Sequence, residues 1–118
     1  MPLPLVASVL ASSLVLPPTV GVTVNCTPAF TTNTAPYDLT LTAEAVLPPD
    51  AVAGGFTCSF QSYDGPKLVA TASGSAPVLV AATSGTVPTR QGLLCVSPWY
   101  RTATTPDGTY ITSSQQCS

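Results

Sequence analysis

The chain has 118 residues, of which 45% are hydrophobic and only 7% are charged, and its formal net charge is -2. The hydrophobic content excludes an intrinsically disordered chain, because disorder requires few apolar residues. The cations Lys67, Arg90 and Arg101 are too few to form the basic cluster that nucleic-acid binding requires.

This length predicts a single domain, residues 1–118, that is large enough to form a hydrophobic core. Soluble proteins typically contain about 25% charged residues, so uncharged polar residues must supply most of the surface here. The low net charge also implies weak repulsion between copies of the chain. Two interpretations follow. Either neighbouring subunits or sugars cover much of the surface, or the chain is a sparsely charged secreted domain.

Apolar and small residues fill the N-terminal segment Leu3–Leu16. This segment is too short for a transmembrane helix, which needs about 20 apolar residues, and its length suits the apolar region of a signal peptide. However, no Lys or Arg precedes it, Pro2 and Pro4 interrupt its start, and no Ala-x-Ala cleavage site follows. We therefore expect residues 1–18 to form an extended strand or arm that pairs within its own domain or inserts into a neighbour. A removed signal peptide is the alternative.

A short unit recurs along the chain: an apolar run, a proline, and a second run that carries a cysteine. Its copies are Ser13–Cys26, Glu44–Cys58 and Ser84–Cys95. The unit is typical of a strand, a corner and a second strand. It makes Leu3–Leu16 the counterpart of two later expected strands, Tyr37–Leu47 and Ala76–Val87.

Apolar and polar residues alternate with period two along most of the chain, which predicts strands with one buried face. The clearest runs are Val20–Cys26, Leu39–Leu47 and Phe56–Phe60, and shorter ones are Leu68–Ser73 and Val78–Ala82. Asp64-Gly65 predicts one turn, and Thr105–Gly108 predicts another that joins Leu93–Ala103 to Thr109–Cys117 as a hairpin. The sequence therefore predicts an all-β fold: a two-sheet antiparallel sandwich of about seven to eight strands.

The 4 cysteines allow three pairings. Zinc would need all four thiolates from distant strands in a chain without histidine, so disulfides are favoured. The last hairpin places Cys95 and Cys117 about one diagonal step apart, and a bulge at Pro98 would bring them within bonding distance. Cys26 and Cys58 then pair by elimination. Two disulfides indicate an extracellular, cell-surface or virion-exterior location, and four buried free thiols in the cytosol are the alternative.

The residues offer little catalytic chemistry. Without histidine the usual general base is missing, and the acids are scattered along the chain: Asp38, Glu44, Asp50, Asp64 and Asp107. We therefore predict no enzyme activity, no cofactor and no metal site. Asn25-Cys26-Thr27 matches the acceptor pattern for N-linked glycosylation, although so short a pattern is frequent by chance.

The densest chemical cluster is Trp99-Tyr100-Arg101. Strand alternation places Trp99 on one face with Cys95 and Cys117, and we expect it to pack over their disulfide in the core. Tyr100 then lies on the opposite face with Tyr110, and Arg101 lies at the rim. This second face is either an exposed patch suited to a protein or glycan partner or a second core layer.

The combination of cysteine-bearing strands and Trp99 resembles that of immunoglobulin-like extracellular sandwiches, in which a core tryptophan packs against a disulfide. The resemblance covers most of the chain at the level of architecture and implies an immunoglobulin-like fold. Here Trp99 follows Cys95 within one hairpin, whereas the family places the tryptophan between two distant cysteines.

Two functional hypotheses follow. The favoured one is a non-enzymatic structural subunit of an extracellular or virion-surface assembly, such as a fibre, coat or decoration protein. Its partners would be proteins, through self-association or a larger assembly, with a glycan possible and no transmembrane segment. The alternative is a secreted binding module or small protein inhibitor that uses Tyr100, Arg101 and Tyr110.

Overall fold

The structure is a computed structural model that describes residues 14–15, 22–105, 111–112 and 115–117. Strands make up its regular structure, so the predicted all-β class is confirmed. They are β1 (Leu14–Val15), β2 (Thr23–Phe30), β3 (Tyr37–Val46), β4 (Ala51–Ser62), β5 (Lys67–Gly74), β6 (Val78–Val87), β7 (Gly92–Thr102), β8 (Ile111–Thr112) and β9 (Gln116–Cys117).

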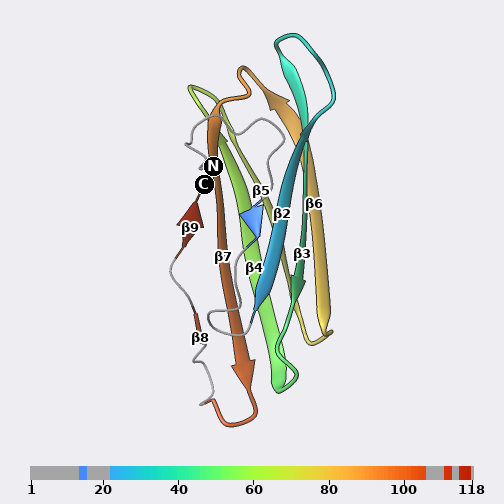
Figure 1. Cartoon of the computed structure of the whole chain (residues 1–118), viewed down its shortest axis with the longest axis vertical. Coiled ribbons are helices and arrows are strands. Elements are labelled where there is room, and N and C mark those ends of the chain that lie inside the picture. The colour runs from blue at the N-terminus through green and yellow to red at the C-terminus, as the bar shows by residue number, and fades with distance from the viewer. Residues whose placement is uncertain (1–13, 16–21, 106–110, 113–114, 118) are drawn as a thin grey trace.

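The strands form two antiparallel sheets (Figure 1). One sheet has the order β1-β2-β3-β6, and the other has the order β5-β4-β7-β8, with β9 also paired to β7. β2 and β3 form a hairpin, as do β4 and β5, and the chain changes sheet between β3 and β4, between β5 and β6, and between β6 and β7. Inward-facing residues of both sheets form one hydrophobic core, as in a β-sandwich.

Period-two alternation sets the buried faces, as the sequence predicted. On β3, Leu39, Leu41, Ala43 and Ala45 are buried, whereas the residues between them are exposed or half-buried. On β4, Phe56 and Phe60 are among the largest fully buried side chains. Successive side chains of a strand point to opposite faces, so the alternate threonines, serines and asparagine form the outer surface.

Both expected disulfides are present, the one that the hairpin geometry favoured and the one that followed by elimination. Cys26 of β2 is bonded to Cys58 of β4, with 6.2 Å between their Cα atoms, and this bond joins the two sheets inside the core. Cys95 of β7 is bonded to Cys117 of β9, with 4.1 Å between their Cα atoms.

The register of the C-terminal strands differs from the expected one. Cys117 lies directly opposite Cys95 in the β7–β9 ladder instead of a diagonal step away. The shift comes from an extra residue on the C-terminal side, because Val96 pairs with Gln116 whereas Trp99 pairs with Thr112. The expected bulge at Pro98 is therefore wrong, because the extra residue belongs to the strand opposite. On β7, Pro98 pairs in regular register with Phe56 of β4.

The structure tests the remaining expected elements only in part. Of Leu3–Leu16 it describes Leu14–Val15, which pair antiparallel with β2, and the rest of residues 1–18 lie outside the described residues. The expected counterparts Tyr37–Leu47 and Ala76–Val87 contain β3 and β6. The predicted turn at Asp64-Gly65 is present, with Asp64 at a φ of 55°. Most of the turn predicted at Thr105–Gly108 lies outside the described residues.

The two disulfides should differ in their sensitivity to reductant. Cys26 and Cys58 are both 0% exposed, whereas Cys117 is exposed, and thiol–disulfide exchange requires access to a sulfur atom. A mild reductant should therefore reduce Cys95–Cys117 before Cys26–Cys58 in the native protein. Timed alkylation followed by peptide mass mapping measures this order. In denaturant the difference should disappear, and equal rates in the native protein would contradict the expectation.

Candidate binding surfaces

The predicted Trp99-Tyr100-Arg101 cluster is divided between the two faces of β7. Leu94 and Val96 are core residues, so alternation turns Tyr100 inward, where it packs against the core, and turns Trp99 and Arg101 outward. The expectation for Trp99 is therefore wrong, whereas Tyr100 follows the alternative in which its face forms a further core layer. Trp99 is half-buried on the outer face instead of being a core residue, and Tyr100 does not share a surface with Arg101. Tyr110 lies outside the described residues.

The indole of Trp99 lies over the backbone of β4. Gly55 is directly opposite Trp99 in the β4–β7 ladder. A Cβ atom at Gly55 would lie 2.7 Å from Trp99 Nε1 and 2.8 Å from the backbone oxygen of Ala72, which is closer than packed atoms approach each other. A residue without a side chain is therefore required at position 55 for the indole to lie there.

Replacing Gly55 with alanine should displace the indole. Because Trp99 is the single tryptophan of the chain, its emission spectrum reports this movement directly. Gly55→Ala should shift the emission to longer wavelength and lower the free energy of unfolding by about 1–3 kcal/mol, as overpacking does. Thr57→Ala, at the next outward-facing position of β4, should leave the emission unchanged. An unchanged spectrum for Gly55→Ala would contradict this placement of the indole.

Hydrogen bonds connect three loops at one end of the sandwich. They are residues 31–36, 63–66 and 88–91, which connect β2 to β3, β4 to β5 and β6 to β7 (Figure 1); we call them the loop platform. Arg90 Nη2 donates a hydrogen bond to the backbone oxygen of Thr32 at 3.0 Å. Ser62 Oγ donates to the backbone oxygen of Thr89 at 3.2 Å, and the Tyr63 amide donates to the Gln91 oxygen at 2.9 Å.

Aromatic side chains hold the Arg90 guanidinium beneath the loop platform. Its Cζ atom lies 4.8 Å from the ring centroid of Tyr37 and 5.9 Å from that of Phe30. Phe30 in turn meets Phe60 edge to face at a centroid distance of 5.9 Å, which connects the group to the core. The negative faces of aromatic rings attract a guanidinium, so Arg90 acts as a structural clamp between loops. Its half-buried position makes it a poor contact for a partner.

Two apolar side chains project from the loop platform and its border. Tyr63 is 67% exposed and Leu93 is 48% exposed. They line a shallow depression of about 550 Å³ together with Gln61, Ser62, Asp64, Gln91 and Gly92. Exposed aromatic and aliphatic groups on fixed backbone, bordered by amides, are suited to contact with another macromolecule. No sequence pattern marks this surface, because its residues come from separate loops.

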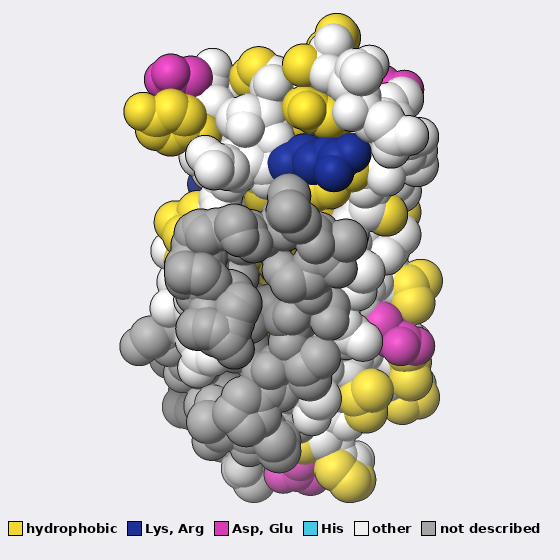
Figure 2. All heavy atoms as spheres, turned by 45° about the horizontal axis from the view of Figure 1, so that its top comes forward, with side chains coloured by type: hydrophobic (Ala, Val, Ile, Leu, Met, Phe, Trp, Pro, Cys, Tyr) yellow, Lys and Arg dark blue, Asp and Glu magenta, His cyan; other side chains and the backbone are white. Residues whose placement is uncertain are grey.

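Charged groups are sparse and form no reactive cluster in the described part of the chain. Figure 2 shows one face of the molecule, on which isolated charged side chains are separated by uncharged ones. Among the described residues, no group of three or more Cys, Asp and Glu side chains could hold a metal ion. The carboxylate of Asp38 accepts a hydrogen bond from Thr86 Oγ1 at 3.4 Å, which is a structural role.

Comparison with known proteins found no matching family model, no similar curated protein and no similar solved structure. In the part of the chain that the structure describes, no helix is long and apolar enough to span a membrane. The two disulfides are consistent with an extracellular protein.

Removing the Arg90 clamp should loosen the loop platform. Arg90→Ala loses the hydrogen bond to Thr32 and the contacts with two rings, so we expect unfolding to become easier by about 1–3 kcal/mol. Amide hydrogens of residues 31–36 should also exchange faster. Lys67→Ala is the control, because Lys67 is exposed and surface substitutions typically change stability by less than about 0.5 kcal/mol. Equal stability of the two variants would show that Arg90 is not a clamp.

Proposed function

We propose that the chain is a non-enzymatic structural subunit of an extracellular or virion-surface assembly, and that copies associate through the loop platform. The observation that supports this most directly is the exposure of Tyr63 and Leu93 on a backbone that three connected loops hold in place. A surface that is already ordered loses little conformational freedom on binding. Tyrosine is also enriched among the residues that dominate interface energies.

The charge distribution supports association of this kind. The net charge of -2 produces weak repulsion between copies. Of the residues that line the depression, Asp64 is the charged one. Two copies in contact there would therefore desolvate few charges. Desolvating unpaired charges is the main cost that opposes an apolar contact.

We also propose that the sandwich is immunoglobulin-like. The order β2-β3-β6 opposite β5-β4-β7-β8 corresponds to the order A-B-E opposite C′-C-F-G in that family. The resemblance has two departures. The disulfide between the sheets joins β2 to β4, which are equivalent to strands A and C, whereas antibody domains join B to F. Trp99 lies on the outer face of β7 instead of in the core.

A secreted binding module is the second candidate. The patch first assigned to it, Tyr100, Arg101 and Tyr110, is not formed by the described residues. The depression beside Tyr63 favours this candidate independently, because the amides of Gln61 and Gln91 and the Asp64 carboxylate provide polar groups next to exposed apolar ones. Concentration-dependent self-association separates the two candidates, since the first requires it and the second does not.

Substitutions on the loop platform should weaken self-association. Tyr63→Ser and Leu93→Ser each remove an exposed apolar side chain, and loss of a central interface residue typically costs more than about 1 kcal/mol, or roughly five- to tenfold in affinity. Sedimentation velocity over a range of concentrations measures the change.

Val52→Ser is the matched control. Val52 is 44% exposed and lies near the opposite end of β4, so this variant should associate like the unmodified chain. An unmodified chain that stays monomeric at every concentration would contradict the structural-subunit proposal. Equal association of all three variants would contradict association through the loop platform.

A further inference from the structure

Residues from three strands line up across the outer face of the β2-β3-β6 sheet. Asn25 of β2 is opposite Glu44 of β3, and Glu44 is opposite Val80 of β6. Neighbouring strands are about 4.8 Å apart, so Asn25 and Val80 are separated by about 10 Å across the sheet. The three residues are exposed, and Val80, at 68%, is one of the two most exposed large hydrophobic side chains in the part of the chain that the structure describes.

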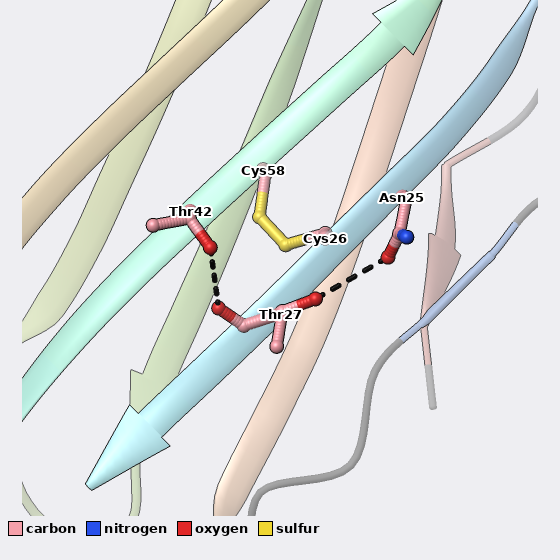
Figure 3. Close-up of a disulfide and its surroundings, with 5 residues drawn as sticks. All are labelled: Asn25, Cys26, Thr27, Thr42 and Cys58. Atoms are coloured by element: carbon pink, nitrogen blue, oxygen red, sulfur yellow. Dashed lines mark hydrogen bonds between the residues drawn. A yellow bond between two sulfur atoms is a disulfide. The ribbon is translucent and has the colours of Figure 1, made fainter.

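The Asn25 side chain is held next to a hydroxyl group on the same face. Side chains at i and i+2 of a strand share a face, and Thr27 Oγ1 donates a hydrogen bond to Asn25 Oδ1 at 3.3 Å (Figure 3). Between them Cys26 turns the other way, into the core, where it bonds Cys58. In the Asn25-Cys26-Thr27 acceptor pattern, the side chains of Asn25 and Thr27 therefore lie on the outer face, and the side chain of Cys26 is buried.

A shallow depression adjoins Asn25 on this face. Its volume is about 530 Å³, and it is lined by Asn25, Thr27, Thr42, Ala43, Glu44, Val80, Ala81 and Ala82. The side chains of Val80 and Ala82 provide apolar surface at one end, and the hydroxyl of Thr42 and the carboxylate of Glu44 lie between them and Asn25. A pyranose ring has the complementary chemistry, because its C–H groups form an apolar face and its hydroxyls form hydrogen bonds.

We propose that Asn25 carries an N-linked glycan whose first sugars lie in this depression and cover Val80. The inference rests on the extracellular location in the proposed function, since the modifying enzyme belongs to the secretory route, but it does not depend on association through the loop platform. It accounts for the exposure of Val80, which would otherwise extend the apolar surface formed by the exposed pair Val46 and Val78 on the same face and favour nonspecific contacts.

The modification is a glycosyl transfer from a glycosyl pyrophosphate donor. A bond forms between Asn25 Nδ2 and the anomeric carbon of the donor, the bond from that carbon to the pyrophosphate oxygen breaks, and one amide proton is released. The pyrophosphate leaves with the electron pair of the broken bond. In the folded chain, β2 is paired with β3 along its whole length, so the transfer takes place before this hairpin forms.

Intact mass of the full chain secreted from eukaryotic cells tests the modification. The unmodified sequence should gain the mass of a glycan, and digestion with a peptide N-glycosidase should remove it. Thr27→Val, which loses the hydroxyl but keeps a similar shape, and Asn25→Gln should both lose the added mass. Thr27→Ser keeps the hydroxyl and should retain it. Secretion of the unmodified sequence without a mass increase would overturn the proposal.

A second measurement tests the position of the sugars. Enzymatic removal of the glycan should increase the fluorescence of a dye that binds exposed apolar surface, and Val80→Ser should abolish most of this increase. An equal increase in the Val80→Ser variant would show that the glycan does not cover Val80. Sedimentation of the Tyr63→Ser variant separates the glycan proposal from the proposal of association through the loop platform. The variant should associate more weakly than the unmodified sequence by the same factor whether or not the glycan is present.

Discussion

The Cys26–Cys58 disulfide is the constraint on which the rest of the fold depends. It connects β2 of one sheet to β4 of the other inside the core, with 6.2 Å between the two Cα atoms, so it determines which positions of the two sheets face each other there. With 7% charged residues, ion pairs can contribute little to stability. In the entropic description, a crosslink that closes a loop of 32 residues stabilises by about 3–4 kcal/mol by restricting the unfolded chain. That amount is a large fraction of the net stability of a small domain.

How well the sequence predicted each strand depended on how clearly it alternates. Residues 39–45 alternate strictly between apolar and polar, and β3 has the expected buried face. By contrast, Leu93, Leu94, Cys95 and Val96 form an unbroken apolar run. Without alternation, the sequence does not indicate which face of this strand is buried. Packing decides it: Leu94 and Val96 point into the core between the sheets, which places Cys95 and Trp99 on the outer face, where Cys95 is nevertheless buried and Trp99 is half-buried. The assumption that each cysteine marks a core face was valid for Cys26 and Cys58 and wrong for Cys95.

The expected bulge at Pro98 was wrong, although an irregularity lies opposite this residue. Proline cannot donate a backbone hydrogen bond, so within a sheet it occurs at edges and irregularities. In the described residues Ser97 and Pro98 have no partner in β8 or β9, and the extra residue lies on the strand opposite. The loop platform was missed for a different reason. Its hydrogen bonds join residues far apart in the sequence, such as Arg90 and Thr32, and no local pattern records such contacts.

The polar faces of the sandwich show how a surface with so few charges can be maintained. On the β2-β3-β6 sheet, hydroxyl groups bond across strands: Thr40 with Ser84, and Thr42 with the Thr27 backbone oxygen. These hydrogen bonds use only part of the capacity of each hydroxyl, so the face can also be solvated or covered by a sugar. The edges are also occupied in part, since β1 pairs with β2, and β8 and β9 pair with β7, which limits strand-to-strand aggregation. The loop end differs from this face because Tyr63 and Leu93 project there from loops that hydrogen bonds connect, which suits it to contact with another copy of the chain.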